Sequence, residues 1–144
     1  MQRRRIGRDG AERLAKIGAL SDLSTGQRRE LARLVDEVTA EAGELLMRQG
    51  DPGYDFLMLE EGSAEVIKDG KRINVMGPGD FFGELAVLAD GVPRTASVVA
   101  TSDLRAIILT AHFMREMRAR MPSVGEHIDR VAAERIERDG RAQS

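Results

Sequence analysis

The sequence contains no cysteine and no tryptophan, and aromatic residues make up only 3% of its 144 positions. Without cysteine there are no disulfides and no thiolate ligands for a metal, which fits the cytoplasm, where we expect the protein. So few aromatic side chains offer no stacking surface for single-stranded nucleic acids. The net charge of −2 gives the chain as a whole no attraction for phosphate backbones.

Long apolar runs are also missing. No stretch approaches the roughly 18 residues of a membrane span, and no apolar segment of a secretion signal follows Met1. The two histidines, His112 and His127, fall in expected helices and lack the spacing of metal ligands. No Gly-x-Ser-x-Gly motif and no Walker-type loop is present. We therefore expect neither an enzyme, nor a metal centre, nor a bound cofactor.

The composition that remains is that of one soluble globular domain. Hydrophobic residues make up 42% and charged residues 32% of a chain long enough for one core. Arginine is far more frequent than lysine, and this composition favours a bacterial source. Residues 1–8 are predicted to be a flexible basic terminus, the alternative being an arm for phosphate backbones or lipid headgroups. Its basic residues are Arg3, Arg4, Arg5 and Arg8. The folded domain is expected over residues 9–138, before a flexible tail at 139–144.

Helices are predicted at both ends of this domain. Residues 9–19 form the first, with Asp9 as its N-cap, and Ser24 and Gln27 form a capping box that starts a second helix ending near Leu34. Residues 111–120 form a third, which ends before Pro122. Residues 123–138 form the last. Its apolar stripe is Val124, Ile128 and Val131, and Arg135 continues that stripe.

Between the helices, glycine and proline recur every seven to nine residues, which predicts short antiparallel strands over residues 36–110. The strand candidates are residues 44–48, 55–61, 64–68, 72–76, 95–100 and 104–110. Asp69-Gly70 predicts a hairpin between the third and fourth of these. Residues 55–61 are apolar on both faces and should be covered on both sides. By alternation, Ile73 and Val75 should share a face. We expect an α+β fold built on a sandwich or roll of antiparallel strands.

One stretch, residues 81–98, carries the chemistry. Gly83 has no Cβ and lets the backbone approach a ligand, and the amides of Leu85 and Ala86 open a short helix that can hold an anion. Arg94 can add a forked hydrogen bond to a phosphate. Glu84 is an acceptor only, so it suits hydroxyl donors. An anion cradle beside a hydroxyl acceptor describes a site for a sugar phosphate.

The segments F-G-E-L-A (residues 82–86) and P-R-T-A (93–96) resemble the phosphate-binding cassette of cyclic-nucleotide-binding domains. This family includes catabolite activator proteins, protein kinase A regulatory subunits and cyclic-nucleotide-gated channels, and the resemblance extends over residues 20–136. It implies a jelly-roll-like β-roll whose last helix acts as a lid, with Arg135 as the lid residue. The implied ligand-binding residues are Phe82, Gly83, Glu84, Leu85, Ala86, Arg94, Thr95 and Ala96. Ile73, Val75 and Val98 are candidates for the wall beside the base.

The resemblance implies a cyclic nucleotide as ligand and an effector protein or domain as partner, but the base stays open. Thr95 has one hydroxyl, which can serve the phosphate in a cAMP site or the 2-amino group of guanine in a cGMP site. We expect cAMP, with cGMP as the alternative. A roll that has lost its ligand is a third reading. Only six residues follow Arg138, so we expect no helix-turn-helix in this chain. We expect the protein to be a monomer or a homodimer.

Overall fold

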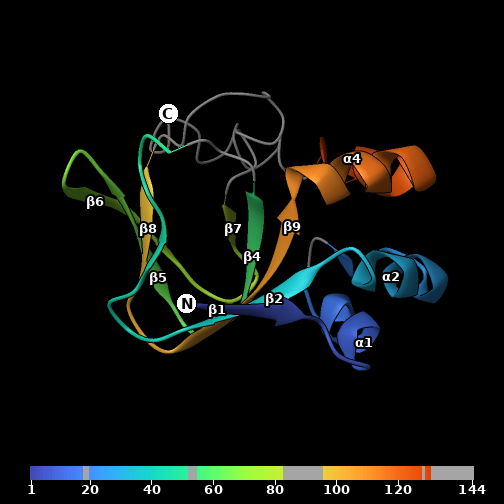
Figure 1. Ribbon diagram of the computed structural model, residues 1–144, viewed down its shortest axis with the longest axis horizontal. Helices are drawn as coiled ribbons and strands as arrows, with labels where there is room; N and C mark the ends of the chain where they lie inside the picture. The colour runs from blue at the N-terminus through green and yellow to red at the C-terminus, as the bar shows by residue number, and fades with distance from the viewer. Residues whose placement is uncertain (18–19, 52–54, 83–95, 128, 131–144) are drawn as a thin grey trace.

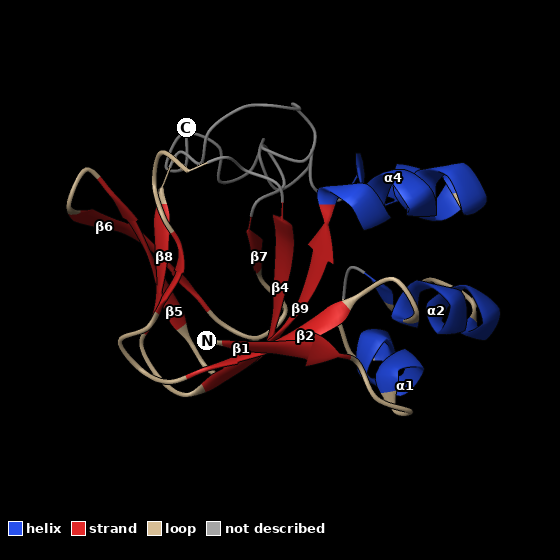
Figure 2. Cartoon of the chain, in the orientation of Figure 1, coloured by secondary structure: helices blue, strands red, loops and turns tan. Residues whose placement is uncertain are grey.

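The computed structural model describes residues 1–17, 20–51, 55–82, 96–127 and 129–130 (Figure 1). Helices α1 (Gly10–Ala15), α2 (Thr25–Ala32) and α4 (Ala111–Arg120) lie together on one side of the strands (Figure 2). The strands are β1 (Gln2–Arg5), β2 (Asp36–Ala40), β3 (Leu45–Met47), β4 (Asp55–Glu61), β5 (Ala64–Lys68), β6 (Lys71–Met76), β7 (Phe81–Phe82), β8 (Ser97–Ala100) and β9 (Leu104–Thr110).

The strands form two antiparallel sheets. One has the order β1-β2-β9-β4-β7 and the other the order β3-β8-β5-β6. The chain crosses repeatedly from one sheet to the other, for example from β4 to β5 and from β8 to β9, which rolls the two sheets around a common interior. This confirms the predicted α+β fold with an antiparallel β-roll between helices.

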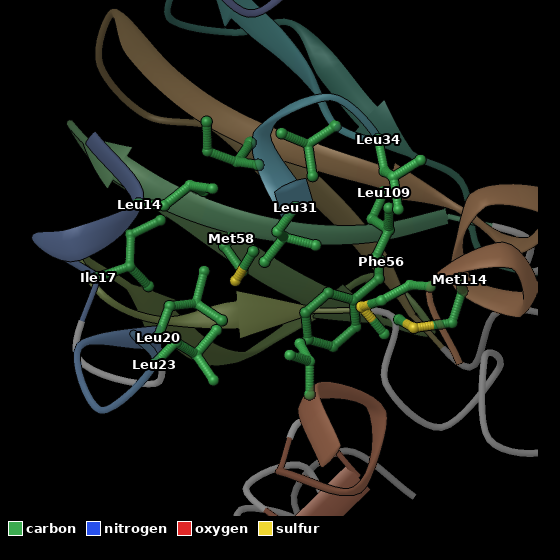
Figure 3. Close-up of a cluster of buried hydrophobic side chains, with 14 of the residues drawn as sticks. Leu14, Ile17, Leu20, Leu23, Leu31, Leu34, Phe56, Met58, Leu109 and Met114 are labelled. Carbon is green, nitrogen blue, oxygen red and sulfur yellow. The ribbon is translucent and has the colours of Figure 1, made fainter. Parts of the chain in front are cut away.

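Two groups of buried side chains fill the molecule, one on each face of the five-stranded sheet. The first, here called the helix-side cluster, packs α1, α2 and α4 against that sheet (Figure 3). In it the rings of Phe56 and Phe81 lie 5.5 Å apart. The second, here called the roll interior, fills the space between the two sheets and includes Leu57, Leu59 and Phe82. β4 contributes to both, with Phe56 and Met58 on one face and Leu57 and Leu59 on the other. The predicted two-sided burial of residues 55–61 is confirmed.

The N-terminal residues are the main departure from prediction. Instead of a flexible arm, β1 pairs along its whole length with β2 at the edge of the five-stranded sheet. Its arginines find acids on the neighbouring strand: Arg3 donates to Asp36 at 3.2 Å, and Arg4 forms an ion pair with Glu37. The prediction of a flexible terminus is wrong for β1 because the acids of β2 compensate its charges. β2 itself was missing from the strand candidates, although it lies within the predicted roll.

The N-terminal helices start as predicted, with one difference. The Ser24 hydroxyl accepts a hydrogen bond from the backbone amide of Gln27 at 3.1 Å. The side-chain oxygen of Gln27 accepts one from the backbone amide of Ser24 at 2.8 Å, so the predicted capping box is confirmed. Asp9 precedes α1, but its side chain makes no capping hydrogen bond. Both helices are shorter than expected, because turns follow them at Lys16 and at Arg33.

The β5–β6 hairpin is confirmed, and it contains an irregularity. Asp69 and Gly70 both have positive φ, 52° and 79°, as a two-residue turn of this kind requires. Val66 pairs with Asn74 but Ile67 pairs with Arg72, so Ile73 is the extra residue of a β-bulge. The bulge breaks the alternation on which we expected Ile73 and Val75 to share a face. Ile73 packs against the roll interior, whereas Val75 is 53% exposed.

The predicted C-terminal helices are described only in part. α4 spans the predicted residues, and residues 122–127 begin a further helix at Pro122. Val124 is fully buried in the helix-side cluster, as its place in the predicted stripe requires. Ile128, Val131 and the lid candidate Arg135 lie outside the described residues.

Candidate functional site

The cassette candidates Gly83, Glu84, Leu85, Ala86, Arg94 and Thr95 lie outside the described residues, and their roles stay predictions. The structure does place the residues on either side of them. Phe82 pairs with Leu57 across β4 and β7 and is 5% exposed, and Ala96 is fully buried. Both belong to the roll interior. The cassette segment is therefore anchored at both ends, leaving β7 in one sheet and rejoining the other sheet at β8.

Of the three candidates for the wall beside the base, two contact the roll interior and one lies on the outer surface. Val98 is fully buried and pairs with Val66, one strand away from the bulge at Ile73. Val98 and Ile73 both contact the roll interior. Val75 is not part of that cluster, because its position on β6 places it on the outer surface. An apolar wall reached from inside the roll would thus use Val98 and Ile73.

A polar junction that sequence reasoning missed ties three segments together where the cassette segment joins β8. Ser97, the first residue of β8, accepts from the backbone amide of Gln49 at 2.8 Å. The Gln49 side chain donates to Asp69 at 2.8 Å and accepts from the Asp69 amide at 2.9 Å. The β5–β6 turn, residue 49 and the start of β8 are thus held in register. Only the turn signal of Asp69-Gly70 was readable in the sequence.

A second polar cluster, also missed, lies at the junction of helices and sheet. Arg13 of α1 is buried and donates to Glu60 of β4 through Nε at 3.1 Å and Nη2 at 2.5 Å. Its Nη1 donates to Glu37 of β2 at 2.7 Å, and Glu37 also pairs with Arg4. One guanidinium therefore joins the first helix to two strands of the roll. A short helix with one arginine next to Leu14 gave no sign that this side chain points inwards.

The charges in this cluster stabilise one another. The hydrogen bond with Glu60 raises the pKa of Arg13, although burial acts in the opposite direction. Burial by itself would raise the pKa of Glu37, but the hydrogen bonds from Arg4 and Arg13 outweigh it and leave that pKa below its ordinary value. With these shifts, Arg13 and Glu37 are both charged near neutral pH. Because they are bound to each other, we assign them a structural role and not a catalytic one.

The described residues contain no group of three or more His, Asp or Glu side chains placed to hold a metal ion. His112 is exposed on α4 and lies 3.9 Å from Glu116. Within the same residues, no helix combines the length and the apolar character needed to cross a bilayer.

Comparison with known proteins places the fold. The family model for the cyclic nucleotide-binding domain matches residues 37–121. A cAMP-dependent protein kinase regulatory subunit from Hypocrea atroviridis is 38% identical over 96 residues, which cover 67% of this chain and 21% of that subunit. The chain thus spans about a fifth of the length of that curated relative. Further curated relatives of this kind are fungal, so the bacterial source that composition favoured is not supported.

Solved structures agree. A cyclic nucleotide-binding domain from Methylobacillus flagellatus has a TM-score of 0.76 at 27% identity, with 91% of this chain and 78% of that chain covered. The regulatory subunit of a cAMP-independent protein kinase A from Trypanosoma brucei has a TM-score of 0.78 at 25% identity, with 90% and 47% covered. The family model matches more than half of the chain, and the roll and the buried flanks of the cassette segment agree with it. The chain therefore belongs to the cyclic nucleotide-binding domain family.

Proposed function

We propose that this domain is a sensor that binds cAMP and passes the binding event to an effector through its C-terminal helix. The observation that carries the proposal is the motif between Phe82 and Ala96, which combines an anion cradle, an arginine and a hydroxyl acceptor in one segment. Two further facts support it. Both ends of the segment are fixed in the roll interior, and the kinase regulatory subunits that the chain resembles are cAMP-dependent.

In the proposed mode of binding, each part of the cyclic phosphate and ribose meets one kind of group. The amides of Leu85 and Ala86, the Arg94 guanidinium and the Thr95 hydroxyl bind the phosphate. Glu84 accepts a hydrogen bond from the ribose 2′-hydroxyl, and Gly83 offers its backbone. Val98 and Ile73 face the base. The domain performs no reaction, because its role is to bind and to respond.

Signalling requires that the ligand favours one of two positions of the C-terminal helix. A ligand shifts such an equilibrium only by its difference in affinity for the two states. Arg135 on that helix would contact the bound ligand in the closed state alone. The Arg135→Ala variant should therefore release the ligand faster while associating at the usual rate. An unchanged dissociation rate in stopped-flow measurements would remove Arg135 from the mechanism.

Calorimetric titration with cAMP tests the proposal. Arg94→Lys keeps the charge but loses the forked geometry, and we expect it to weaken binding about ten- to hundred-fold, or about 1.5–3 kcal/mol. Arg72→Lys, at an exposed position of β6, is the matched control and should bind normally. Tight cAMP binding that Arg94→Lys leaves intact would show that the cassette is not the site. No binding of any cyclic nucleotide would indicate a roll that has lost its ligand.

A second candidate ligand is cGMP, because Thr95 can face either the phosphate or a guanine 2-amino group. The likeness to a cAMP-independent regulatory subunit also makes the base worth testing directly. If Thr95 serves the phosphate, Thr95→Ala should weaken cAMP and cGMP by a similar factor. Selective loss of cGMP binding, from a wild type that prefers cGMP, would assign the site to cGMP instead.

A further inference from the structure

A groove of about 750 Å³ lies between the N-terminal segment and the helices α1 and α2. It lies on the helical side of the molecule, whereas the β5–β6 hairpin extends on the other side (Figure 1). Its charged lining is strongly one-sided: Arg5, Arg8, Arg28, Arg29 and Arg33 against the single acid Glu12. The lining carries a net charge of +4, although the whole chain carries −2. Positive charge is therefore concentrated here well beyond what the composition requires.

These five arginines form no ion pair with any acid in the described part of the chain. Two acids close by in the sequence have other partners. Glu30 of α2 pairs with Arg120 of α4 at 3.5 Å, and Glu37 is held by Arg13 and Arg4. The groove thus differs from the junction around Arg13, where opposite charges are matched within the fold.

Two of the arginines are held in place by neutral acceptors. Arg5 donates to the carbonyl of Arg33 at 3.1 Å, and Arg28 donates to the carbonyls of Ser21, at 3.3 Å, and Leu23. A carbonyl fixes the guanidinium without cancelling its charge, and a guanidinium has five N–H donors, so further donors stay available to a ligand. Arginines fixed in this way lose less side-chain entropy when they bind.

Part of the groove lining consists of small side chains. Ala11 and Ala15 of α1 and Ala32 of α2 line it. Gly10 allows the two helices to come this close, because a Cβ there would lie 3.0 Å from Ile6 and 3.1 Å from Ala32. The lining thus combines small apolar side chains with cationic ones, which can take both the backbone and the acidic side chains of an extended chain.

We propose that this groove is a docking site for an acidic segment of a partner polypeptide. The charge of the walls selects an anionic partner, and planar guanidinium groups match carboxylates in a two-pronged fashion. The concave shape and its volume suit a few residues of peptide. A bilayer or a duplex presents a broad surface, which fills a concave groove of this volume less well than a narrow extended chain does. None of the residues that line this groove belongs to the cassette motif, and the proposal does not depend on the proposed function.

Fluorescence anisotropy of the full chain with a labelled decapeptide of alternating glutamate and alanine tests the proposal. The double variant Arg29→Gln/Arg33→Gln removes two exposed groove arginines and should weaken binding about five- to ten-fold. The control Arg72→Gln/Arg115→Gln removes the same charge from exposed positions on β6 and α4 and should leave binding within two-fold. Arg29→Lys/Arg33→Lys, which keeps the charge and loses the fork, should fall between the two. Thermal unfolding of each variant checks that the fold is intact.

Three outcomes would overturn it. Equal weakening in the groove and control variants would show that binding follows net charge alone. Absence of binding at low salt would show that the groove takes no acidic peptide. Tighter binding of a short DNA duplex, or of phosphatidylserine vesicles, at the same ionic strength would assign the groove to another class of partner. A lysine and alanine decapeptide of the same length should not bind.

Discussion

The helix-side cluster and the roll interior differ in the side chains that fill them. Of the 15 described residues of the roll interior, eight are alanine or valine, which allow two sheets to pack closely. The 16 described residues of the helix-side cluster include no alanine and are mostly leucine, methionine and phenylalanine. Its methionines are Met58, Met114, Met117 and Met121. Unbranched thioethers adapt to small shifts of neighbouring helices. The comparison indicates a rigid roll, in which both ends of the cassette segment are fixed, next to a helical layer whose side chains can repack.

Both clusters share one wall, the pair β4 and β9. Side chains of each strand alternate between them, as with Ile107 in the helix-side cluster and Ile108 in the roll interior. A change in the roll can therefore reach the helices through a single layer of strands. Arg13 adds a polar connection across the same boundary.

The largest effect should come from truncating adjacent residues of β4 that face opposite clusters. Leu57→Ala and Met58→Ala should each lower the free energy of unfolding by about 2–5 kcal/mol. Leu57→Ala should cost more, because the strands around it cannot close the cavity, whereas the methionines near Met58 can rearrange. Urea unfolding of the two variants measures this. An equal or greater cost for Met58→Ala would contradict the contrast between the two clusters.

A smaller effect is expected from breaking the connection between helix and roll. Glu37→Gln removes the charge that Arg13 and Arg4 share and should cost about 1.5–3 kcal/mol at pH 7. The control Glu61→Gln removes only an exposed partner of Arg105 and should stay within about 0.5 kcal/mol. If both variants unfold at the same urea concentration, the Arg13 junction contributes nothing to stability.

The lowered pKa of Glu37 also predicts that the free energy of unfolding depends on pH. Because the pKa of Glu37 is lower in the folded state, its contribution is complete above its unfolded pKa and is lost as the pH falls through its folded value. Wild type should lose stability more steeply than Glu37→Gln on acidification below about pH 4. Chemical unfolding at several pH values should show the gap between them narrowing. A constant gap would mean that the charge of Glu37 is not what matters.

The smallest effect should come from the helical layer alone. Ser24→Ala removes the N-cap of α2 and should cost about 1 kcal/mol. Because the roll is untouched, affinity for cyclic nucleotide should not change, which isothermal titration can verify. Ser63→Ala, which removes hydroxyl contacts to Thr101 and Ser102 within the roll, serves as the comparison. A loss of affinity in Ser24→Ala would show that the helices and the ligand site are more tightly coupled than the packing indicates.

Sequence reasoning succeeded where local signals were strong. The capping box at Ser24, the turn at Asp69-Gly70 and the two apolar faces of β4 each follow from short-range chemistry, and the structure has all three. It failed where contacts between residues far apart in the sequence determine the local structure. β1 is a strand only because β2 supplies both a pairing edge and the acids for its arginines. A run of arginine by itself is typical of a solvated terminus.

The same limit applies to single side chains. Nothing near Arg13 in the sequence shows that Glu37 and Glu60 meet it, since the two acids come from different strands. The outward position of Val75 depends on a bulge that one sequence does not show. The cassette is the opposite case, because its residue types and spacing identify it, while its arrangement lies outside the described residues.

Strand β1 also bears on how this protein behaves at high concentration. The outer edge of a sheet offers unpaired amides and carbonyls to any other chain, and flat apolar edges nucleate aggregates. Here that edge is occupied by Gln2–Arg5, whose side chains are all exposed and mostly cationic. Without β1 the edge would pass to β2, whose Val38 and Ala40 belong to the roll interior. An edge strand with exposed, charged side chains is a poorer template for pairing with another chain than a flat apolar edge would be.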